Sequence, residues 1–512
     1  MRVVTSKQMR EIEENAGQYD ITFYRLMENA GSAAAAFIRR TIPVEGINCM
    51  IFCSKGNNGG DGLVVARRLF ENGANVLIVM VDGQPKSGEA ASMYSMVELM
   101  SLPILSFTEK YDDIVRYLDN TDVIVDAIFG TGFSGELDTM HRRACDLINE
   151  AIAAVFSLDL PTGVSCDAGR VDPGSVQADF TIVFDSLKPA HIQPACQPFF
   201  GQIQVVDIGI PEEARYGLST MVMHADLEGV MASLPPRELE SHKGSHGRLL
   251  NITGSLAYQG APVLSTMAAQ RCGVGYTVVA GVPAVCAGVT QRALEAIMLP
   301  LPVSASGGIS AAGSIEKLLP ALGKATAVLF GCGMGNTEDT AQLLELVLKN
   351  ASCPVIVDAD GINALAGNIN ILEGITCPVI LTPHPGEMSR LTGLPVEDIQ
   401  ADRNKAALDF AAAHKVTVVL KGHETVTANA DGLATVNTTG NPGLAKAGSG
   451  DVLAGMIGAL AAQGVPPYRA AVCGVFLHGL AADRAAERLS QYAMLPSDIL
   501  TDLCGIFLEN GR

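Results

Sequence analysis

The amino-acid sequence predicts an α/β protein of two three-layer domains, each with a mostly parallel sheet between helices. The first observation is the length, because 512 residues exceed the size at which one hydrophobic core usually stops growing. The second is the alternation of short Val- and Ile-rich runs with longer helical patterns, which is typical of parallel sheets covered on both faces. The third is the segment 210–247, where strand periodicity lapses and Pro, Glu and Ser accumulate. We therefore expect domains at residues 1–222 and 223–512.

The predicted strands fall into two sets. The first half is expected to contain strands at 47–53, 75–81, 122–127, 154–158, 180–184 and 202–206. The second half is expected to contain strands at 247–252, 276–280, 327–330, 354–357, 379–381 and 416–420, followed by a hairpin that turns at Asp431-Gly432. Helical patterns fill most of the gaps between these runs.

Composition narrows the class of protein. Hydrophobic residues make up 48% of the chain and charged residues 17%, which is enough apolar surface for packed cores. The formal net charge of −19 argues against binding to nucleic acid or to an anionic membrane. The twelve cysteines show no zinc-type spacing, so we expect buried free thiols. The chain has neither a secretory-type apolar region nor a run of about eighteen apolar residues, so the cytoplasm is the expected location.

A first candidate site follows the strand that ends at Cys53. The sequence GNNGGDG at 56–62 lies between a strand and a helix, where glycines let backbone N–H groups approach phosphate. Asp126, Asp159 and Thr162 each come at or just after the end of a predicted strand, so one crevice is expected to collect them. Their oxygens suit an alkali or alkaline-earth ion. The alternatives are that the glycines only form a tight turn and that the two aspartates only cap helices.

The motifs GNNGGDG, VDAIFGTG and LDLPTG, in this order, resemble those of the NAD(P)HX epimerase family across residues 1–220. The resemblance implies a Rossmann-like fold, a bound potassium ion and interconversion of the R and S hydrates of the nicotinamide ring. It implies Asn58, Asp126 and Thr162 as potassium ligands. We take Asp159 as the candidate acid/base, because inverting the hydrated carbon requires proton transfer beside it. The implied substrate contacts are Asn57, Asn58, Gly59, Gly60, Asp61, Gly130, Thr131, Gly132, Phe133, Ser134, Gly135, Glu136 and Asp159.

A second candidate site is the sequence GSGD at 448–451, where a Gly-rich loop enters a long apolar helix. Backbone N–H groups and the positive end of the helix dipole would stabilise a phosphate undergoing transfer there. Asp451 would then take the proton from an attacking hydroxyl. The alternative is an ordinary N-cap aspartate. No Walker motif is present, and the loop resembles the GAGD signature of ribokinase-like enzymes, with Ser449 replacing Ala.

Further motifs resemble the NAD(P)HX dehydratase family over residues 225–512. They are HKGSHGRLLNITGS, AYQGAPVLSTMAAQRCGVGYTVV, LFGCGMG, VDADGINAL, LTPHPGEMSRLTG, VVLKGHETV and GNPGLAKAGSGD. The resemblance implies that ADP or ATP phosphorylates the hydroxyl of the S hydrate, after which phosphate leaves and NAD(P)H is restored. The implied substrate contacts are Ala261, Gly335, His384 and Asp451, and the implied nucleotide contacts are Lys421, Gly422, His423, Glu424, Thr425 and Gly450. The family usually has GPGLG where this chain has Gly331-Cys332-Gly333-Met334-Gly335.

Several alternatives stay open at this stage. His384 lies between two prolines and would suit a purely structural role in a turn, and Lys421 would suit a solvated surface position. The sequence decides neither between ADP and ATP nor between the substrates NADHX and NADPHX. The resemblance also implies a homo-oligomer, and phosphoryl transfer implies a magnesium ion. A competing hypothesis is a C-terminal kinase for a vitamin-precursor alcohol, joined to an N-terminal binding or scaffold module.

Overall fold

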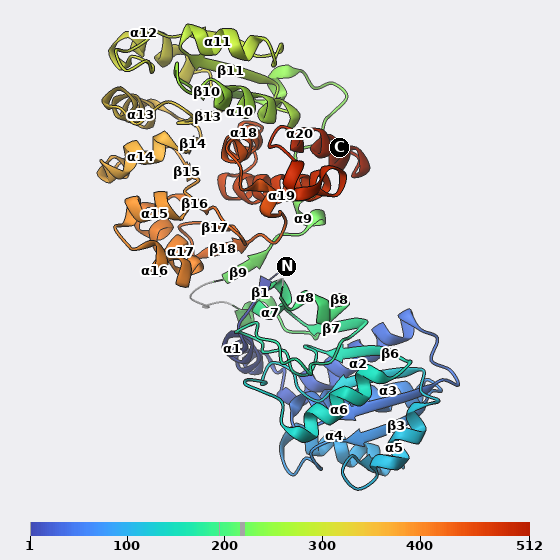
Figure 1. Ribbon diagram of the computed structural model, residues 1–512. Helices are drawn as coiled ribbons and strands as arrows, with labels where there is room; N and C mark the ends of the chain where they lie inside the picture. The colour runs from blue at the N-terminus through green and yellow to red at the C-terminus, as the bar shows by residue number, and fades with distance from the viewer. Residues whose placement is uncertain (1, 194, 216–220) are drawn as a thin grey trace. The chain divides into compact units, whose positions relative to one another are not determined.

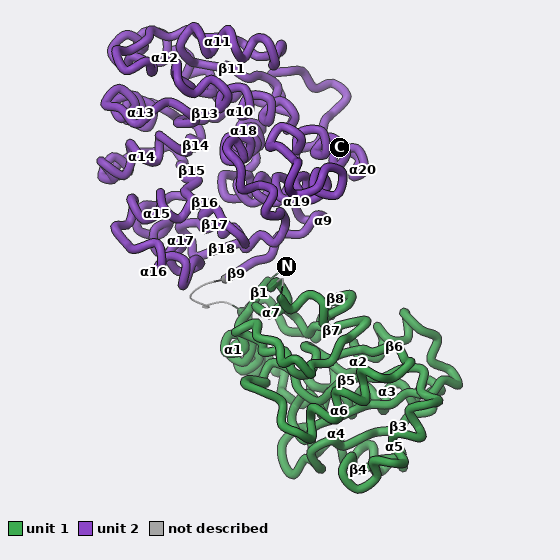
Figure 2. Tube along the Cα trace, viewed as in Figure 1, with its two compact units in different colours: residues 1–221 green, residues 222–512 purple. Residues whose placement is uncertain are grey.

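The computed structural model describes residues 2–193, 195–215 and 221–512 (Figure 1). The chain divides into two compact units, Met1–Met221 and Val222–Arg512, which are coloured separately in Figure 2. The division falls one residue before the boundary expected from the sequence. Each unit has its own sheet and its own core, as the lengths of the two halves lead one to expect.

Unit 1 contains a seven-stranded sheet in the order β4-β3-β2-β5-β6-β7-β8, in which all the pairings are parallel. Its strands are β2 Asn48–Cys53, β3 Asn75–Met80, β4 Ile104–Ser106, β5 Val123–Ala127, β6 Ala154–Leu158, β7 Phe180–Phe184 and β8 Gln202–Val206. The strand order reverses between β2 and β5, whose register aligns Phe52 with Asp126. In open parallel sheets such a reversal opens a ligand crevice at the carboxyl ends of the two strands.

Helices cover both faces of this sheet. Alternate residues of one strand face opposite sides, so Ile51 packs with α2, α3 and α4, while Phe52 packs with α5 and α6. The helices of unit 1 are α1 Ser6–Ala16, α2 Phe23–Thr41, α3 Asn57–Glu71, α4 Gly88–Leu99, α5 Tyr111–Leu118, α6 Thr139–Glu150, α7 Pro189–Ile192 and α8 Gln197–Phe200, with short 3-10 turns at Gly17–Tyr19 and Glu212–Arg215.

Unit 2 contains a larger sheet, in which the strands follow the order β9-β18-β17-β16-β15-β14-β13-β10-β11-β12. Its strands are β9 Met221–His224, β10 Arg248–Ile252, β11 Tyr276–Gly281, β12 Ile297–Pro300, β13 Ala327–Phe330, β14 Val355–Val357, β15 Val379–Leu381, β16 Thr417–Leu420, β17 Val426–Ala428 and β18 Leu433–Val436. The strands from β10 to β16 are parallel, and β16-β17-β18 form an antiparallel meander. Here the order reverses between β10 and β13.

The helices of unit 2 form two layers, with α10, α18, α19 and α20 on one face of the sheet and α11 to α17 on the other (Figure 1). These helices are α9 Leu227–Ser233, α10 Gly260–Arg271, α11 Pro283–Thr290, α12 Ala311–Leu322, α13 Glu338–Asn350, α14 Asp360–Ala366, α15 Pro385–Thr392, α16 Val396–Ala401, α17 Arg403–His414, α18 Ser449–Ala462, α19 Pro467–Ala493 and α20 Ile499–Glu509, with 3-10 turns at Lys243–His246, Ile369–Leu372 and Pro442–Leu444. Helix α18 is almost entirely buried, since α10, α19 and the sheet surround it.

All twelve predicted strands are present, and the predicted hairpin turns at Gly432, which has φ of +84°. Strands β4 and β12 were not expected. Both lie at sheet edges, where short, half-buried runs give little periodic signal. The segment 210–247, in which strand periodicity lapses, nevertheless contains α9 and the short strand β9, which lies beside β18 in the sheet. Residues 216–220 of that segment lie outside the described residues.

All the cysteines are free thiols, and every one except Cys504 is buried, as expected. Among the described residues, no helix combines the length and apolar character needed to cross a membrane.

Candidate active sites

The GNNGGDG sequence of unit 1 is a helix N-terminus, which corrects the expectation of a Gly-rich loop. Gly56 is the N-cap, and α3 begins at Asn57. The reason is close packing: a Cβ on Gly59 would lie 1.8 Å from the Ser54 carbonyl oxygen, and one on Gly62 would lie 2.5 Å from the Ala127 Cβ. The glycines therefore bring the start of α3 against the carboxyl edge of β2 and β5, where the strand order reverses.

Asp126 lies at this edge and is completely buried. Its carboxylate accepts hydrogen bonds from the Thr162 hydroxyl at 2.6 Å, the Thr162 N–H at 2.9 Å and the Ser157 hydroxyl at 2.9 Å. Burial raises the pKa of Asp126, and these hydrogen bonds oppose the shift. Across the described parts of the chain, no Lys, Arg or His forms an ion pair with this carboxylate. A buried carboxylate without a cationic side chain is a fitting ligand for a metal ion.

Asn58 completes this arrangement. A Cβ on Gly130 would lie 3.1 Å from the Asn58 Oδ1, so the start of α3 meets the loop that follows β5. The Asn58 Nδ2 is buried and has no hydrogen-bond partner among the described residues. Residues 130–136, the predicted substrate stretch, form an irregular and largely exposed loop after this point. The structure thus brings Asn58, Asp126, Thr162 and Gly130 to one edge of the sheet.

Asp159 forms the centre of a second group at the same edge of unit 1. It follows β6 with φ of +61°, a left-handed conformation that is costly for a residue other than Gly and is often found at functional sites. Its carboxylate forms an ion pair with Lys188, whose side chain is only 1% exposed. The His191 Nε2 lies 2.8 Å from the Asp159 carbonyl oxygen, and the Lys188 Nζ also donates to the Phe184 carbonyl at 3.0 Å.

Two further carboxyl groups lie within the electrostatic reach of Lys188. Burial raises the pKa of Asp61 well above its usual range, and Asp159 and Glu13 add to the shift. Burial likewise raises the pKa of Glu13 to about 7, although Lys188 opposes this. Burial and Lys188 lower the pKa of His191 to about 4. Three acidic groups thus share one buried ammonium, which is an arrangement suited to proton transfer near neutral pH.

Sequence reasoning missed Lys188, Glu13 and His191. Lys188 follows the end of β7, the same position on the sheet that singled out Asp126, so strand-end position was a usable signal for it. Glu13 lies on α1, far from any motif, and no local pattern pointed to it. The idea that Asp126 and Asp159 cap the helices that follow them is wrong. Helix α6, which follows Asp126, is capped by Asp138, and the N-cap position of α7, which follows Asp159, is Lys188.

In unit 2, Asp451 lies in the first turn of α18 and is not its N-cap. The cap is Gly448, with φ of +100°, and Asp451 is the third helical residue, which excludes the plain N-cap alternative. Burial, and then the neighbouring Asp358 carboxylate, raise the pKa of Asp451 to about 6. A carboxyl group that titrates near 6 is well suited to take up a proton at physiological pH.

An ion pair between Asp358 and Lys421 lies next to Asp451. Lys421 Nζ donates to Asp358 Oδ1 at 2.9 Å and lies 3.8 Å from Glu387 Oε2. The Lys421 side chain is 20% exposed, which excludes the solvated surface alternative. A Cβ on Gly450 would lie 3.5 Å from Lys421 Nζ, so the start of α18 faces this ammonium directly. Helix N–H groups and a buried ammonium that face each other form an anion site.

The remaining predicted residues of unit 2 gather along the same carboxyl edge. The loop Gly331–Gly335 follows β13 at the point where the strand order reverses, and a Cβ on Gly333 would lie 3.1 Å from the Ala261 Cβ. The Gly335 N–H donates to Asp360 Oδ2 at 2.7 Å. The predicted nucleotide contacts at 422–425 form the turn between β16 and β17, closed by a Thr425 hydroxyl that donates to the Gly422 carbonyl at 2.9 Å.

His384 has the structural role that the sequence left open. It is the N-cap of α15, and its Nδ1 accepts hydrogen bonds from the N–H groups of Gly386 at 3.0 Å and Glu387 at 3.3 Å. The His384 main-chain N–H in turn donates to Glu387 Oε2 at 2.8 Å, which links it to the Lys421 cluster. The imidazole is half exposed, and its Nε2 lies 3.6 Å from Glu387 Oε1.

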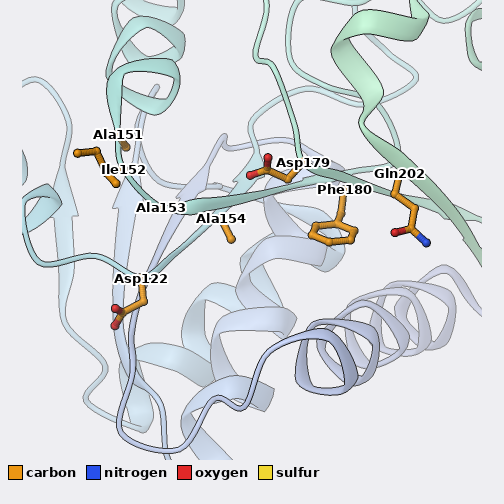
Figure 3. Close-up of a pocket in the computed structure, with 8 residues that line it drawn as sticks. All are labelled: Asp122, Ala151, Ile152, Ala153, Ala154, Asp179, Phe180 and Gln202. Carbon is orange, nitrogen blue, oxygen red and sulfur yellow. The ribbon is translucent and has the colours of Figure 1, made fainter.

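A surface hollow in unit 1 is separate from these sites. It is lined by Asp122, Ala151, Ile152, Ala153, Ala154, Asp179, Phe180 and Gln202 (Figure 3). These residues lie at the amino ends of β5, β6, β7 and β8, whereas Asp126 and Asp159 lie at the carboxyl ends. The hollow therefore lies at the opposite edge of the sheet from Asp126 and Asp159.

Two mostly parallel sheets, each with acidic side chains near its carboxyl edge, define a two-domain α/β enzyme. Family models agree: residues 249–504 match NAD(P)H-hydrate dehydratase, and residues 24–190 match the YjeF-related protein N-terminus. Relatives that match over nearly the whole chain share both parts, so the chain belongs to the family of bifunctional NAD(P)H-hydrate repair enzymes. The Rossmann-like and ribokinase-like fold classes expected from the sequence are confirmed.

Individual relatives support this membership along the whole chain. The bifunctional NAD(P)H-hydrate repair enzyme Nnr of Moorella thermoacetica is 37% identical over 98% of this chain and 95% of its own length. The enzyme of the same name from Escherichia coli is 32% identical over 96% of this chain and 90% of its own. A hypothetical protein from Streptococcus mutans covers 57% of this chain and all of its own, with 28% identity and a TM-score of 0.50. Because both halves match, the vitamin-kinase hypothesis is not favoured.

Proposed function

We propose that unit 1 interconverts the R and S hydrates of NADH and NADPH, and that unit 2 dehydrates the S hydrate at the expense of ADP or ATP. One observation carries this division: each unit holds one of the two family matches and its own group of acidic side chains near the carboxyl edge of its sheet. The two activities complement each other, since the first converts the R hydrate into the substrate of the second. The substrate and nucleotide contacts that the motifs imply are part of this proposal.

The dehydratase step follows from the anion site of unit 2. The α18 N-terminus with Gly450 and the Lys421 ammonium would hold the phosphate being transferred, and residues 422–425 would contact the nucleotide. Asp451 takes the proton from the ring hydroxyl while the new O–P bond forms and the bond to the nucleotide breaks. The C–O bond then breaks, phosphate leaves with its electron pair, and the neighbouring carbon loses a proton. The ring double bond is thereby restored, with Ala261, Gly335 and His384 as substrate contacts.

The epimerase step is assigned to the Asp159 group. Inverting the hydrated carbon requires proton transfer to a departing hydroxyl and proton removal from an incoming water. Asp159 would perform one of these transfers, and Lys188 holds its carboxylate in place. Residues 57–61 and 130–136 would hold the substrate along the same edge.

The residues present fit a potassium ion in unit 1. Asn58, Asp126 and Thr162 supply amide, carboxylate and hydroxyl oxygens, the hard ligands that such an ion prefers. The buried Asp126 also has no cationic partner among the described side chains, so an ion would supply the missing charge. When bound, the ion would orient these oxygens and supply a positive charge to the substrate.

Potassium dependence gives a direct prediction. We expect the epimerase rate of the full-length protein to fall at least about tenfold when potassium is replaced by a large organic cation, a loss of about 1.4 kcal/mol in transition-state stabilisation. The dehydratase rate, measured on pure S hydrate in the same buffer, serves as the control. An Asp126→Asn variant should have a low epimerase rate that potassium no longer changes. An epimerase rate that stays unchanged without potassium would contradict the proposed potassium site.

The proposal also includes a magnesium ion, a cellular location and an oligomeric state. A magnesium ion, held mainly by the nucleotide phosphates, is expected to accompany the phosphoryl transfer. We also predict a cytoplasmic homo-oligomer that binds neither nucleic acid nor membranes.

The decisive experiment mixes the full-length protein with the R hydrate and either ADP or ATP. Restored absorbance of reduced nicotinamide, together with release of inorganic phosphate, is the expected result, because it requires both activities in sequence. A stable phosphorylated product would instead indicate a kinase. Conversion of the S hydrate but not of the R hydrate would leave unit 1 without its proposed activity.

The pH dependence of the dehydratase follows from Asp451. Its pKa is raised to about 6, and the base must be ionised to accept a proton, so activity is present above this pH and lost below it. We expect kcat/KM for the S hydrate to fall about tenfold per pH unit below 6. Measurement of kcat/KM from pH 5 to pH 8 checks this, and a profile that is flat across this range would contradict the role of Asp451.

A further inference from the structure

Cys332 lies beside the acidic groups of unit 2, in a position where the family usually has proline. Its thiol donates a hydrogen bond to Asp358 Oδ2 over 3.7 Å, and its side chain is fully buried. Ligand atoms of Cys332, Asp358 and Asp451 all lie within 4.8 Å of one another. Of the twelve cysteines, this one alone is found with two carboxylates in such a group among the described residues.

A metal ion bound here would replace the thiol proton, and the spacing of Cys332 and Asp358 is compatible with such an ion. With Zn–S of about 2.3 Å and Zn–O of about 2.0 Å, a tetrahedral zinc ion separates its sulfur and oxygen ligands by about 3.5 Å. The observed Sγ–Oδ2 distance of 3.7 Å is close to this value. Three protein ligands with a fourth open position is also the usual pattern for zinc that keeps a water or another small ligand.

The Asp358 carboxylate is already arranged to serve such an ion. Its Oδ1 accepts from Lys421 Nζ at 2.9 Å and from the Thr382 hydroxyl at 2.6 Å, whereas its Oδ2 faces Cys332. A metal ion on Oδ2 therefore leaves the Lys421 ion pair intact. Asp451 is only partly buried and leaves an entry path for the ion.

The local charge also favours a cation. Three carboxylates, those of Asp358, Glu387 and Asp451, lie near the single ammonium of Lys421. If all three are ionised, two negative charges are left uncompensated. A divalent ion reduces this surplus, and the thiol selects a soft ion such as Zn²⁺ over the hard Mg²⁺.

We propose that Cys332, Asp358 and Asp451 form an inhibitory site for thiophilic divalent cations. A bound ion would occupy the Asp451 oxygen that is needed to accept the proton, so the dehydratase would stop while the ion stays bound. The inhibition rests on the proposed function, whereas binding of the ion depends only on the three side chains.

Cadmium binding tests the site without any reaction. Adding Cd²⁺ to the full-length protein should produce a thiolate-to-metal charge-transfer band in the ultraviolet. The Cys332→Ser and Cys332→Pro variants should lose this band, and their affinity for Cd²⁺ should fall more than about 100-fold. A smaller loss, of about 10- to 100-fold, is typical when the lost residue only hydrogen-bonds to a metal ligand. Cys504→Ser is the matched control, because Cys504 is the one cysteine that is not fully buried, and it should keep the band. Circular dichroism checks that each variant folds.

Zinc inhibition gives the second measurement, with each variant compared with its own metal-free rate. Zn²⁺ should inhibit the dehydratase of the wild type and of Cys504→Ser, should inhibit Cys332→Pro far less, and should spare epimerisation in every form. The proposal fails if the Cys332 variants bind Cd²⁺ as the wild type does, or if Zn²⁺ inhibits them equally. A wild type that shows the cadmium band but has no dehydratase activity would refute the proposed function and leave the metal site standing.

Discussion

An Asp451→Asn variant is expected to lose dehydratase activity by 10²- to about 10⁴-fold, the usual contribution of a positioned acid or base. The amide has nearly the same shape as the carboxylate but does not accept the proton of the ring hydroxyl. Asp451 lies in the first turn of α18, and Gly448, not Asp451, caps the helix, so the substitution leaves the helix start intact. The measurement is the initial rate of NAD(P)H formation from the S hydrate at saturating ADP or ATP.

Two controls separate this chemical effect from a loss of structure. Epimerisation by the same preparation should be unchanged, because unit 1 has its own core and its own site. The residual activity of the variant should also lose the decline below pH 6 that Asp451 imposes on the wild type. If the variant keeps more than about a tenth of the wild-type rate, a group other than Asp451 is the catalytic base.

The sequence predicted the fold well because the fold depends on periodic patterns. Buried parallel strands are continuous apolar runs, so β2, β5 and β13 stood out from their surroundings. Edge strands lack this signal, and β4 and β12 were missed for that reason. The glycines at 56–62 were placed correctly beside the sheet edge, but their role in helix packing depends on Ser54 and Ala127, which only the folded chain brings near them.

The candidate sites were only partly predictable from the sequence. Asp126, Asp159, Lys421 and Asp451 follow strands or open a helix, so their position along the chain already indicates the ligand edge of a sheet. Partners are harder to predict, because a pair such as Lys421 and Asp358 joins two strand ends that lie 63 positions apart. In the sequence, Cys332 is only a departure from a family motif. Its contact with Asp358 in the folded chain is what indicates a candidate metal ligand.

The second large effect is expected at Asp159. An Asp159→Asn variant should slow the equilibration of the R and S hydrates by 10²- to about 10⁴-fold, since an amide does not shuttle protons. It also leaves the buried Lys188 ammonium without its ion-pair partner. Removing one partner of a buried ion pair commonly costs about 3–5 kcal/mol of folding free energy, so stability has to be measured together with activity. The rate is followed by the conversion of pure R hydrate in the absence of nucleotide.

A Lys188→Met, Asp159→Asn double variant resolves the ambiguity between chemistry and stability. It removes the uncompensated charge, so unit 1 should regain most of the stability that the single variant loses, while epimerisation stays low. Dehydration of pure S hydrate by unit 2 serves as the control for intact protein. If the double variant instead recovers both stability and epimerase activity, the carboxylate only holds Lys188 in place, and the proton transfer belongs to a neighbour such as Glu13, whose pKa of about 7 suits it to that task.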